Sequence, residues 1–225
     1  MIASRYELKF VADRHNRDDI ISMLRILPIQ LYSPHETRRV NNIYFDNNLG
    51  QCLNDNVSGK SQRYKVRLRW YGESSDVCIN PQLEIKIKDN HTNSKRIIQI
   101  PVNIDLRNTT WQDVIKKIQL HLSSDPEIER LFLETTIPSL INWYYRKYFV
   151  TYCGKVRVTL DYNQGAINQI YSVSPEVDHT MFQQAPCIIE IKGKEEDFSS
   201  IIEYANQLPF KRSRFSKYVY WMHYA

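Results

Sequence analysis

The chain has 225 residues, 42% of them hydrophobic and 24% charged, which suffices for one large domain with a real core and is ordinary for a globular protein. No uninterrupted apolar run approaches the length of a membrane span, and Arg5, Glu7 and Lys9 exclude a normal secretory signal, so we expect a cytoplasmic protein with free cysteine thiols. The net charge of +5 is low for a sequence-independent nucleic-acid binder, which argues against nucleic acid as a partner.

The first half of the chain is predicted to consist mainly of strands. After a strand at 4–11, an amphipathic helix is expected from Arg14 to Leu27, with Asp13 as its N-cap and Pro28 as its stop. A turn at 47–50 follows the second strand. The strands of this half are expected at 38–46, 62–72, 78–89 and 95–101.

The second half mixes helices with strands. Helices are expected at 110–121, 126–133, 198–207 and 215–224, and strands at 141–152, 155–163 and 186–194. No internal repeat or linker-like composition occurs, so we expect a single domain over 1–225. Long strands with helices inserted between groups favour an α+β fold, in which an antiparallel sheet closes into a barrel and helices brace it.

Five of the predicted strands carry a charge at every second residue. They are Glu7-Leu8-Lys9-Phe10, Lys65-Val66-Arg67-Leu68-Arg69, Glu84-Ile85-Lys86-Ile87-Lys88, Arg157-Val158-Thr159-Leu160-Asp161 and Glu190-Ile191-Lys192-Gly193-Lys194. Because strand side chains alternate between faces, each stretch presents charges on one face and mostly apolar residues on the other. The pooled charged faces hold nine basic and four acidic residues. In a closed sheet they would line one cavity suited to a polyanion and its metal ion.

The pattern also has a structural explanation, since a sheet with one solvated face alternates apolar and charged residues. A merely solvated sheet, however, would use Ser, Thr and Gln as freely as Arg. Like charges about 5 Å apart on neighbouring strands repel by roughly 3 kcal/mol at an effective dielectric near 20. The excess of basic residues therefore favours an anionic ligand.

The residues that would bind this ligand must act through their side chains. The six glycines form neither GxGxxG nor GxxxxGK[ST], so no backbone loop of the familiar kinds cradles phosphate. Arg meets two phosphate oxygens at once, and Lys adds mobile charge. Glu84 and Glu190 each precede a Lys by two residues, which suits a divalent ion, Mn²⁺ or Mg²⁺, held partly by carboxylate and partly by phosphate oxygens.

Segments spread over most of the chain resemble a known family. In order, they are Tyr44-Phe45-Asp46, Arg67-Leu68-Arg69-Trp70-Tyr71-Gly72, Glu84-Ile85-Lys86, Tyr145-Arg146-Lys147-Tyr148, Arg157-Val158-Thr159-Leu160-Asp161, Glu190-Ile191-Lys192 and Phe215-Ser216-Lys217-Tyr218. The chain resembles VTC domains, the polyphosphate polymerase domains of the vacuolar transporter chaperone family within the triphosphate tunnel superfamily. The resemblance implies a tunnel of about eight antiparallel strands that is lined by basic residues.

The resemblance also implies roles for single residues. Glu190 is expected to hold the metal ion. A further basic residue comes from the strand after Glu84, and here it is either Lys95 or Arg96. Catalysis is expected from Arg67, Arg69, Lys86, Arg157, Lys192 and Lys217, and substrate binding from Lys9, Arg146 and one of Lys95 and Arg96.

The expected activity is transfer of the ATP γ-phosphoryl group to a polyphosphate chain. Hydrolytic tunnel enzymes usually begin with ExExK, and here Arg5 stands at the first Glu position, which favours a polymerase. The alternatives are a tripolyphosphatase or nucleoside triphosphatase of the same fold, and a non-catalytic module that binds polyphosphate. The chain shows no SPX domain or transmembrane helix, so we expect a stand-alone prokaryotic version whose membrane-protein partner, if any, is another chain.

Overall fold

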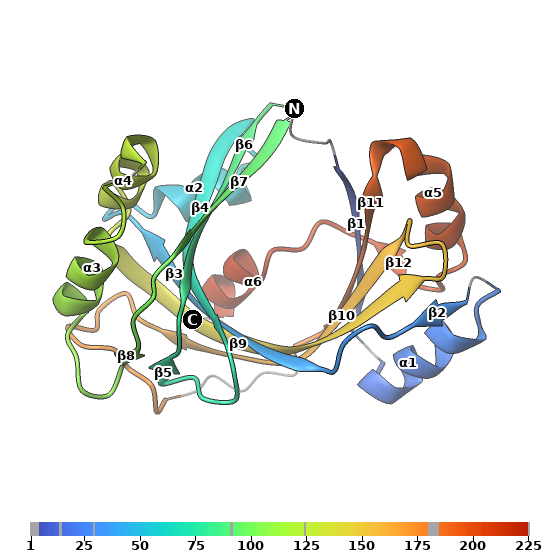
Figure 1. Ribbon diagram of the computed structural model, residues 1–225, viewed down its shortest axis with the longest axis horizontal. Helices are drawn as coiled ribbons and strands as arrows, with labels where there is room; N and C mark the ends of the chain where they lie inside the picture. Colours follow the sequence, from blue (N-terminus) through green and yellow to red (C-terminus); the bar gives the residue numbers. More distant parts are fainter. Residues whose placement is uncertain are drawn as a thin grey trace. The chain divides into compact units, whose positions relative to one another are not determined.

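The computed structural model describes residues 5–13, 15–28, 30–90, 92–123, 125–179 and 185–224. The chain divides into two compact units, and each is described by itself. Unit 1 comprises Met1–Arg38, Tyr144–Gln164 and Gln183–Ser216, and unit 2 comprises Arg39–Trp143, Gly165–Phe182 and Lys217–Ala225. The strands β9 (Ile137–Thr151) and β10 (Arg157–Asn168) run from one unit into the other (Figure 1).

Unit 1 is an antiparallel sheet with helices against its apolar face. Along the sheet the strands follow the order β12-β1-β11-β10-β9, with β2 paired to β9. Figure 1 shows α5 alongside β11. The elements are β1 (Arg5–Ala12), α1 (Arg17–Ile26), β2 (Leu31–Tyr32), β11 (Cys187–Lys194), a 3-10 turn (Glu195–Asp197), α5 (Phe198–Asn206) and β12 (Lys211–Arg212).

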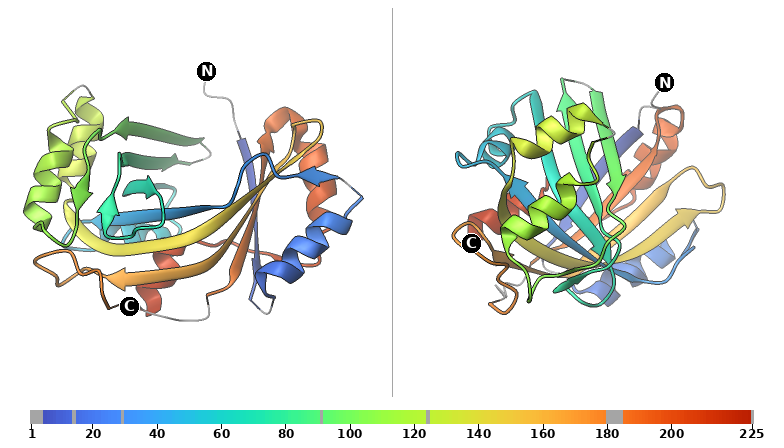
Figure 2. Two further views of the ribbon diagram at one scale, coloured as in Figure 1. Left: turned by 60° about the horizontal axis from the view of Figure 1, so that its bottom comes forward. Right: turned by 60° about the vertical axis from the view of Figure 1, so that its left-hand side comes forward.

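Unit 2 continues from β9 and β10 with the strand order β9-β3-β4-β6-β7. Figure 2 shows α3 and α4 together on one side of β4, β6 and β7. The elements are β3 (Arg38–Asp46), α2 (Gln51–Val57), β4 (Gln62–Tyr71), β5 (Val77–Cys78), β6 (Gln82–Asp89), β7 (Thr92–Gln99), β8 (Ile104–Asp105), α3 (Trp111–Gln119), α4 (Pro126–Leu133) and α6 (Lys217–Tyr224).

The alternation predicted for the charged strands is present in both units. In unit 1 the buried residues Leu8, Ile191 and Val158 pack with α1 and α5 in one hydrophobic core. In unit 2 Val66 and Ile85 pack with α3 and α4 in another. The apolar face of each sheet is therefore covered by helices, and the charged residues stand on its opposite face.

The predicted mixed α+β class with a large antiparallel sheet is confirmed, and the sheet has ten strands. The strand order has β12 and β7 as its ends, and within the described ranges no pairing joins them, so a closed barrel is not found. None of the described helices is both long and apolar enough to cross a membrane. All four cysteines are free thiols.

Several predicted boundaries were wrong for local reasons. Asn16, not Asp13, caps α1, because its side chain accepts hydrogen bonds from the N–H groups of Asp18 and Asp19. The strand expected at 78–89 is interrupted, since Asn80 takes a left-handed conformation (φ 42°) just before Pro81. The helix α2 (Gln51–Val57) was not predicted.

Candidate functional site

The first group of candidate functional side chains, here called the Glu84 cluster, lies in unit 2 and consists of Glu84, Arg67, Arg69 and Lys95. Glu84 is 2% exposed. Its Oε2 accepts hydrogen bonds from Nε and Nη2 of Arg67 at 2.8 and 2.5 Å. Its Oε1 accepts from Nζ of Lys95 at 2.6 Å, and Nη1 of Arg69 lies 3.6 Å away. One buried carboxylate thus orients several basic side chains.

Strand register explains this grouping. Arg67 lies opposite Glu84 in the pairing of β4 with β6, so both side chains leave the same face of the sheet. On that face Lys86 stands between Lys65 of β4 and Lys95 of β7. Basic residues on this face therefore exceed the single carboxylate that they surround, which makes the cluster a potential binding site for an anion.

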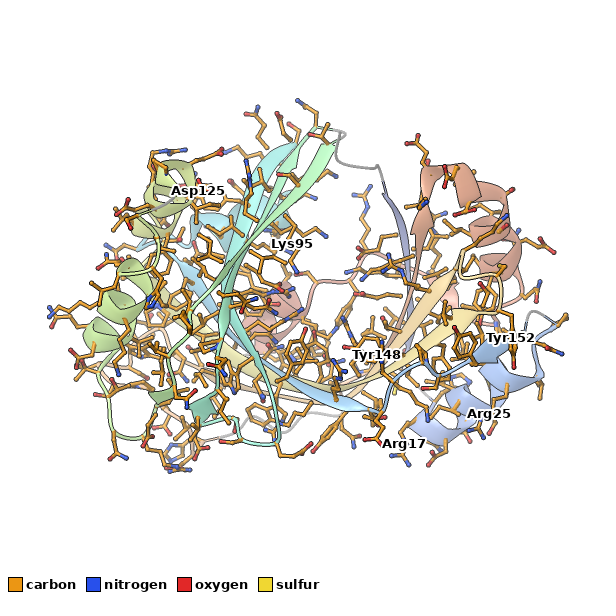
Figure 3. All side chains as sticks on the ribbon, viewed as in Figure 1. Arg17, Arg25, Lys95, Asp125, Tyr148 and Tyr152 are labelled. Carbon is orange, nitrogen blue, oxygen red and sulfur yellow. The ribbon has the colours of Figure 1, made fainter. Side chains whose placement is uncertain are left out.

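The register also separates Lys95 from Arg96. Lys95 lies opposite Lys86 and belongs to the charged face, whereas Arg96 lies opposite the core residue Ile85. Arg96 is exposed, and its Nη2 lies 3.8 Å from Oε2 of Glu127 in α4. Figure 3 shows Lys95 on the side of the sheet away from α3 and α4. Of the two residues that the sequence left open, the structure places Lys95 in the cluster.

Electrostatics keep Glu84 ionised. Burial raises the pKa of its carboxyl group, but the charges of Arg67, Arg69 and Lys95 outweigh burial and lower the pKa to about 2. Burial also lowers the pKa of Lys95, despite the opposing effect of Glu84. Because a lowered carboxyl pKa stabilises the fold above the unfolded-state value, this contribution is present at neutral pH. It is lost only as the pH falls from the ordinary glutamate range toward 2.

The buried side-chain amides of Asn42 and Asn142 support Arg69 through successive hydrogen bonds. Nε of Arg69 donates to Oδ1 of Asn42 at 2.9 Å, and Nδ2 of Asn42 donates to Oδ1 of Asn142 at 3.0 Å. Since Arg69 can only donate, it fixes the orientation of both amides. The Nδ2 group of Asn142 is then left as a buried donor without a hydrogen-bond partner in the described part of the chain. These two asparagines hold the guanidinium of Arg69 in one orientation.

The second group, here called the Glu190 cluster, lies in unit 1 and consists of Glu190, Glu7, Lys9, Lys192, Arg146 and Asp161. Nζ of Lys9 lies 3.1 Å from a carboxylate oxygen of Glu7 and 3.1 Å from one of Glu190. Nζ of Lys192 lies 2.5 Å from Glu190 and 3.8 Å from Glu7. Two lysines therefore alternate with two carboxylates, as the pairing of β1 with β11 requires.

Arg146 completes the Glu190 cluster from β9. Its Nε and Nη2 donate to the two carboxylate oxygens of Asp161 at 2.6 and 2.7 Å, and Nη2 lies 3.7 Å from Glu190. Burial lowers the pKa of Arg146, but Asp161, Tyr144 and Glu190 together outweigh burial and raise the pKa above its ordinary value. For Lys9, burial likewise lowers the pKa, and Glu190 and Glu7 raise it above its ordinary value. Lys9 and Arg146 therefore keep their positive charges at neutral pH.

Two further predicted site residues, Arg157 and Lys217, belong to neither cluster. Arg157 lies opposite Lys192 in the pairing of β10 with β11, on the charged face of unit 1, and is exposed. Lys217 is the first residue of α6 and is 9% exposed. The sequence placed Glu7 and Asp161 on the charged faces without a role of their own, and it did not single out Asn42 or Asn142. For Asn42, the alternation of Asn42, Tyr44 and Asp46 along β3 was a usable signal.

The carboxylates of the Glu190 cluster fit a divalent ion. Mg²⁺ is usually bound through one or two carboxylates together with waters and substrate phosphates. Glu7 and Glu190 share the same two lysines and could supply such a pair. Glu84 instead pairs with three basic residues, Arg67, Arg69 and Lys95. Within the ranges that the structure describes, no group of three or more His, Cys, Asp or Glu side chains is placed to hold a metal.

Comparisons with known proteins agree with this architecture. A family model described as the VTC domain matches residues 4–224. No curated protein matches the chain. Similar solved structures include a putative adenylate cyclase from Vibrio parahaemolyticus, with 13% identity, 98% of each chain covered and a TM-score of 0.51.

Two further solved structures are similar. One is a putative adenylyl cyclase from Hippeastrum with a dominant triphosphatase activity, at 15% identity, covering 96% of this chain and 93% of that one, with a TM-score of 0.50. The other is a protein from Pyrococcus horikoshii OT3, at 14% identity, covering 97% and 96%, with a TM-score of 0.50. At these identities the likeness concerns the fold alone.

Proposed function

The chain belongs to the VTC domain family, and from this membership we propose that it is a metal-dependent polyphosphate polymerase that transfers the γ-phosphoryl group of ATP to a polyphosphate chain. The observation that carries the proposal is the Glu84 cluster, where Arg67, Arg69 and Lys95 surround one carboxylate on a face that also presents Lys65 and Lys86. Such an excess of ordered cations suits a polyanion.

The proposed reaction needs little covalent chemistry from the protein. Phosphoryl transfer depends mainly on positioning and on neutralising the charge of the transferring group. We assign binding of the donor phosphates to Arg67, Arg69, Lys86 and Arg157. Lys192 and Lys217 would stabilise charge on the transferring group, and Lys9, Lys95 and Arg146 would contact substrate phosphates. Asn42 and Asn142 keep Arg69 oriented while it binds.

We propose Glu190 as the ligand of Mn²⁺ or Mg²⁺, with Glu7 as a second carboxylate. A bound divalent ion would supply positive charge to the phosphate oxygens. The composition of the two clusters supports this choice. The Glu190 cluster has as many carboxylates as basic residues, whereas three basic residues surround the single carboxylate of Glu84, so a divalent ion meets less repulsion in the Glu190 cluster. Glu84, the other metal candidate, is better suited to orienting Arg67 and Lys95. The closed barrel and the membrane-protein partner stay predictions.

Two other functions use the same residues. The triphosphatase activity of the Hippeastrum relative favours hydrolysis, in which water replaces the polyphosphate acceptor. A module that binds polyphosphate without turnover would need only the basic residues. Arg5 at the place where hydrolytic tunnel enzymes carry a first Glu supports the polymerase over the hydrolase.

The deciding experiment is incubation of the protein with γ-phosphate-labelled ATP and Mn²⁺, with products resolved on a gel. A metal-dependent ladder of labelled polyphosphate is expected. Labelled free phosphate alone would replace the proposal with hydrolysis. Unchanged ATP, together with binding of tripolyphosphate, would replace it with a binding module.

Anion binding can be tested with a matched pair of variants on β7. Tripolyphosphate at about 100 times its dissociation constant should stabilise the wild-type protein by about 2.7 kcal/mol and raise Tm by about 5–10 °C. Lys95→Ala should weaken tripolyphosphate affinity by about fivefold, because it removes a partly exposed ammonium group from the cluster. Arg96→Ala, on the opposite face, should leave the affinity unchanged.

Thermal unfolding at several tripolyphosphate concentrations measures these affinities. A loss of affinity in Arg96→Ala with none in Lys95→Ala would contradict the placement of the site on the charged face. A wild-type shift near zero would contradict both the polymerase and the binding module, and would leave a structural sheet with one solvated face.

A further inference from the structure

Asp46 is a buried carboxylate at the end of β3, and its hydrogen bonds join three segments of unit 2. The residue is 2% exposed. Its Oδ1 accepts from the N–H groups of Asn47 and Cys52, both at 2.8 Å. Its Oδ2 accepts from the N–H of Leu53 at 3.0 Å and from the hydroxyl of Tyr218 at 2.8 Å. Asp46 therefore ties β3 and the start of α2 to α6.

Tyr44, two residues earlier on the same face of β3, holds Tyr218 from another direction. Its ring stacks on the Tyr218 ring, with centroids 4.8 Å apart and an interplanar angle of 14°. Its hydroxyl oxygen accepts a hydrogen bond from Nη1 of Arg67 at 3.4 Å. Its backbone carbonyl accepts from the hydroxyl of Ser139 at 3.0 Å. Tyr44 thus contacts both Tyr218 and an arginine of the Glu84 cluster.

These contacts are made next to Lys217 in the chain. Lys217 directly precedes Tyr218 and is the first residue of α6, a helix of eight residues. So short a helix is not stable by itself and depends on tertiary contacts for its position. The hydroxyl of Tyr218 and its stacked ring supply such contacts, and they lie one residue from the Lys217 backbone.

We infer that Asp46 is a positioning residue for Lys217: through the hydroxyl of Tyr218 it holds the start of α6 against β3, and Tyr44 links the same tyrosine to Arg67. What Lys217 does once it is held rests on the proposed function. A carboxylate suits this task because charge-assisted hydrogen bonds to buried N–H and O–H donors are strong and directional. The hydroxyl of Tyr218 is the part of the connection that can be removed without changing the stacked ring.

The test compares Tyr218→Phe with Tyr220→Phe in the labelled-ATP assay. Tyr218→Phe removes the hydroxyl that Asp46 accepts and keeps the ring on Tyr44. We expect kcat to fall about tenfold and KM for ATP to change less than about twofold, because the affected lysine acts on the transferring group. Tyr220→Phe is the same change in the same helix, at a ring that contacts Trp221 and Tyr224, and should leave kcat unchanged.

A double-mutant cycle separates positioning from general stability. In a Lys217→Ala background, Tyr218→Phe should cause no further loss of kcat, because the residue that it positions is already gone. An equal further loss, or a wild-type kcat in Tyr218→Phe with normal Tm, would overturn the inference. If Tyr218→Phe does not fold, Asp46→Asn takes its place, since it removes the carboxylate charge while keeping the side chain's size.

The outcome also distinguishes this inference from the proposed function. If the wild-type protein makes no labelled ladder, the proposed polymerase fails, and the same cycle is then run on tripolyphosphate affinity. Loss of affinity in Tyr218→Phe that disappears in the Lys217→Ala background would still support positioning of Lys217. Equal affinities in all four proteins would overturn it.

Discussion

Replacing Arg67 by alanine is expected to reduce labelled-ladder formation at least about a hundredfold, which corresponds to about 2.7 kcal/mol of transition-state stabilisation. Arg67 is a quarter exposed, and two of its nitrogens are oriented by Glu84 while a third contacts Tyr44. Its guanidinium is therefore ordered before substrate arrives and still accessible to it. Such preorganised charge is where phosphoryl transfer gains most of its acceleration.

The fold should survive the change, because Glu84 keeps Arg69 and Lys95 as neighbours. A loss of about 1.5–3 kcal/mol in the free energy of unfolding is expected, since the hydrogen bonds of Arg67 to a charged, buried carboxylate are removed. Arg67→Lys should recover only part of the rate, because an ammonium group cannot bind two phosphate oxygens as the planar guanidinium does.

Arg130→Ala, which removes a surface partner of Glu134, is the matched control for Arg67→Ala and should keep full activity. Normal turnover of Arg67→Ala would remove Arg67 from the site.

Replacing Glu190 by glutamine is the second large expected effect, and the metal-dependent ladder should disappear. An amide keeps an oxygen at this position but carries no charge, and hard divalent ions depend on carboxylate charge. The substitution also takes a counter-charge from Lys9 and Lys192, which would then share Glu7. Mn²⁺ affinity, measured by electron paramagnetic resonance of free Mn²⁺, should fall at least about tenfold.

Glu196→Gln provides the control for the Glu190 experiment. Glu196 follows β11 at the surface and pairs with Lys194 at 2.9 Å, so its loss should change neither Mn²⁺ affinity nor ladder formation. If Glu190→Gln bound Mn²⁺ as tightly as the wild-type protein, the metal would have to lie elsewhere. Glu7→Gln would then show whether Glu7 is the main ligand.

The alternation of charged and apolar residues could be predicted from sequence because it is a local property of strands. In Lys65-Val66-Arg67-Leu68-Arg69, each side chain's face follows from its place in the strand alone. The same rule placed Val66 and Leu68 in the core under α3 and α4. Family-level motifs then predicted the family and assigned phosphate-binding roles to some of these charged residues; a family model over residues 4–224 confirms the family, and the roles stay predictions. Helix ends were less predictable, because a cap such as Asn16 depends on backbone geometry at a single residue.

The sequence by itself determined the class of fold, the family and the polar faces on which its basic residues stand. Tertiary structure alone decided which of these residues meet, because strand register depends on pairing between distant segments. Register placed Lys95 rather than Arg96 beside Glu84, and Glu7 beside Lys192. The packing of distant segments also joined Asn42 to Asn142, 100 residues away, and Asp46 to the helix residue Tyr218, 172 residues away. Neither connection leaves a local pattern in the sequence, since each depends on how the folded chain brings two distant polar side chains into hydrogen-bond distance.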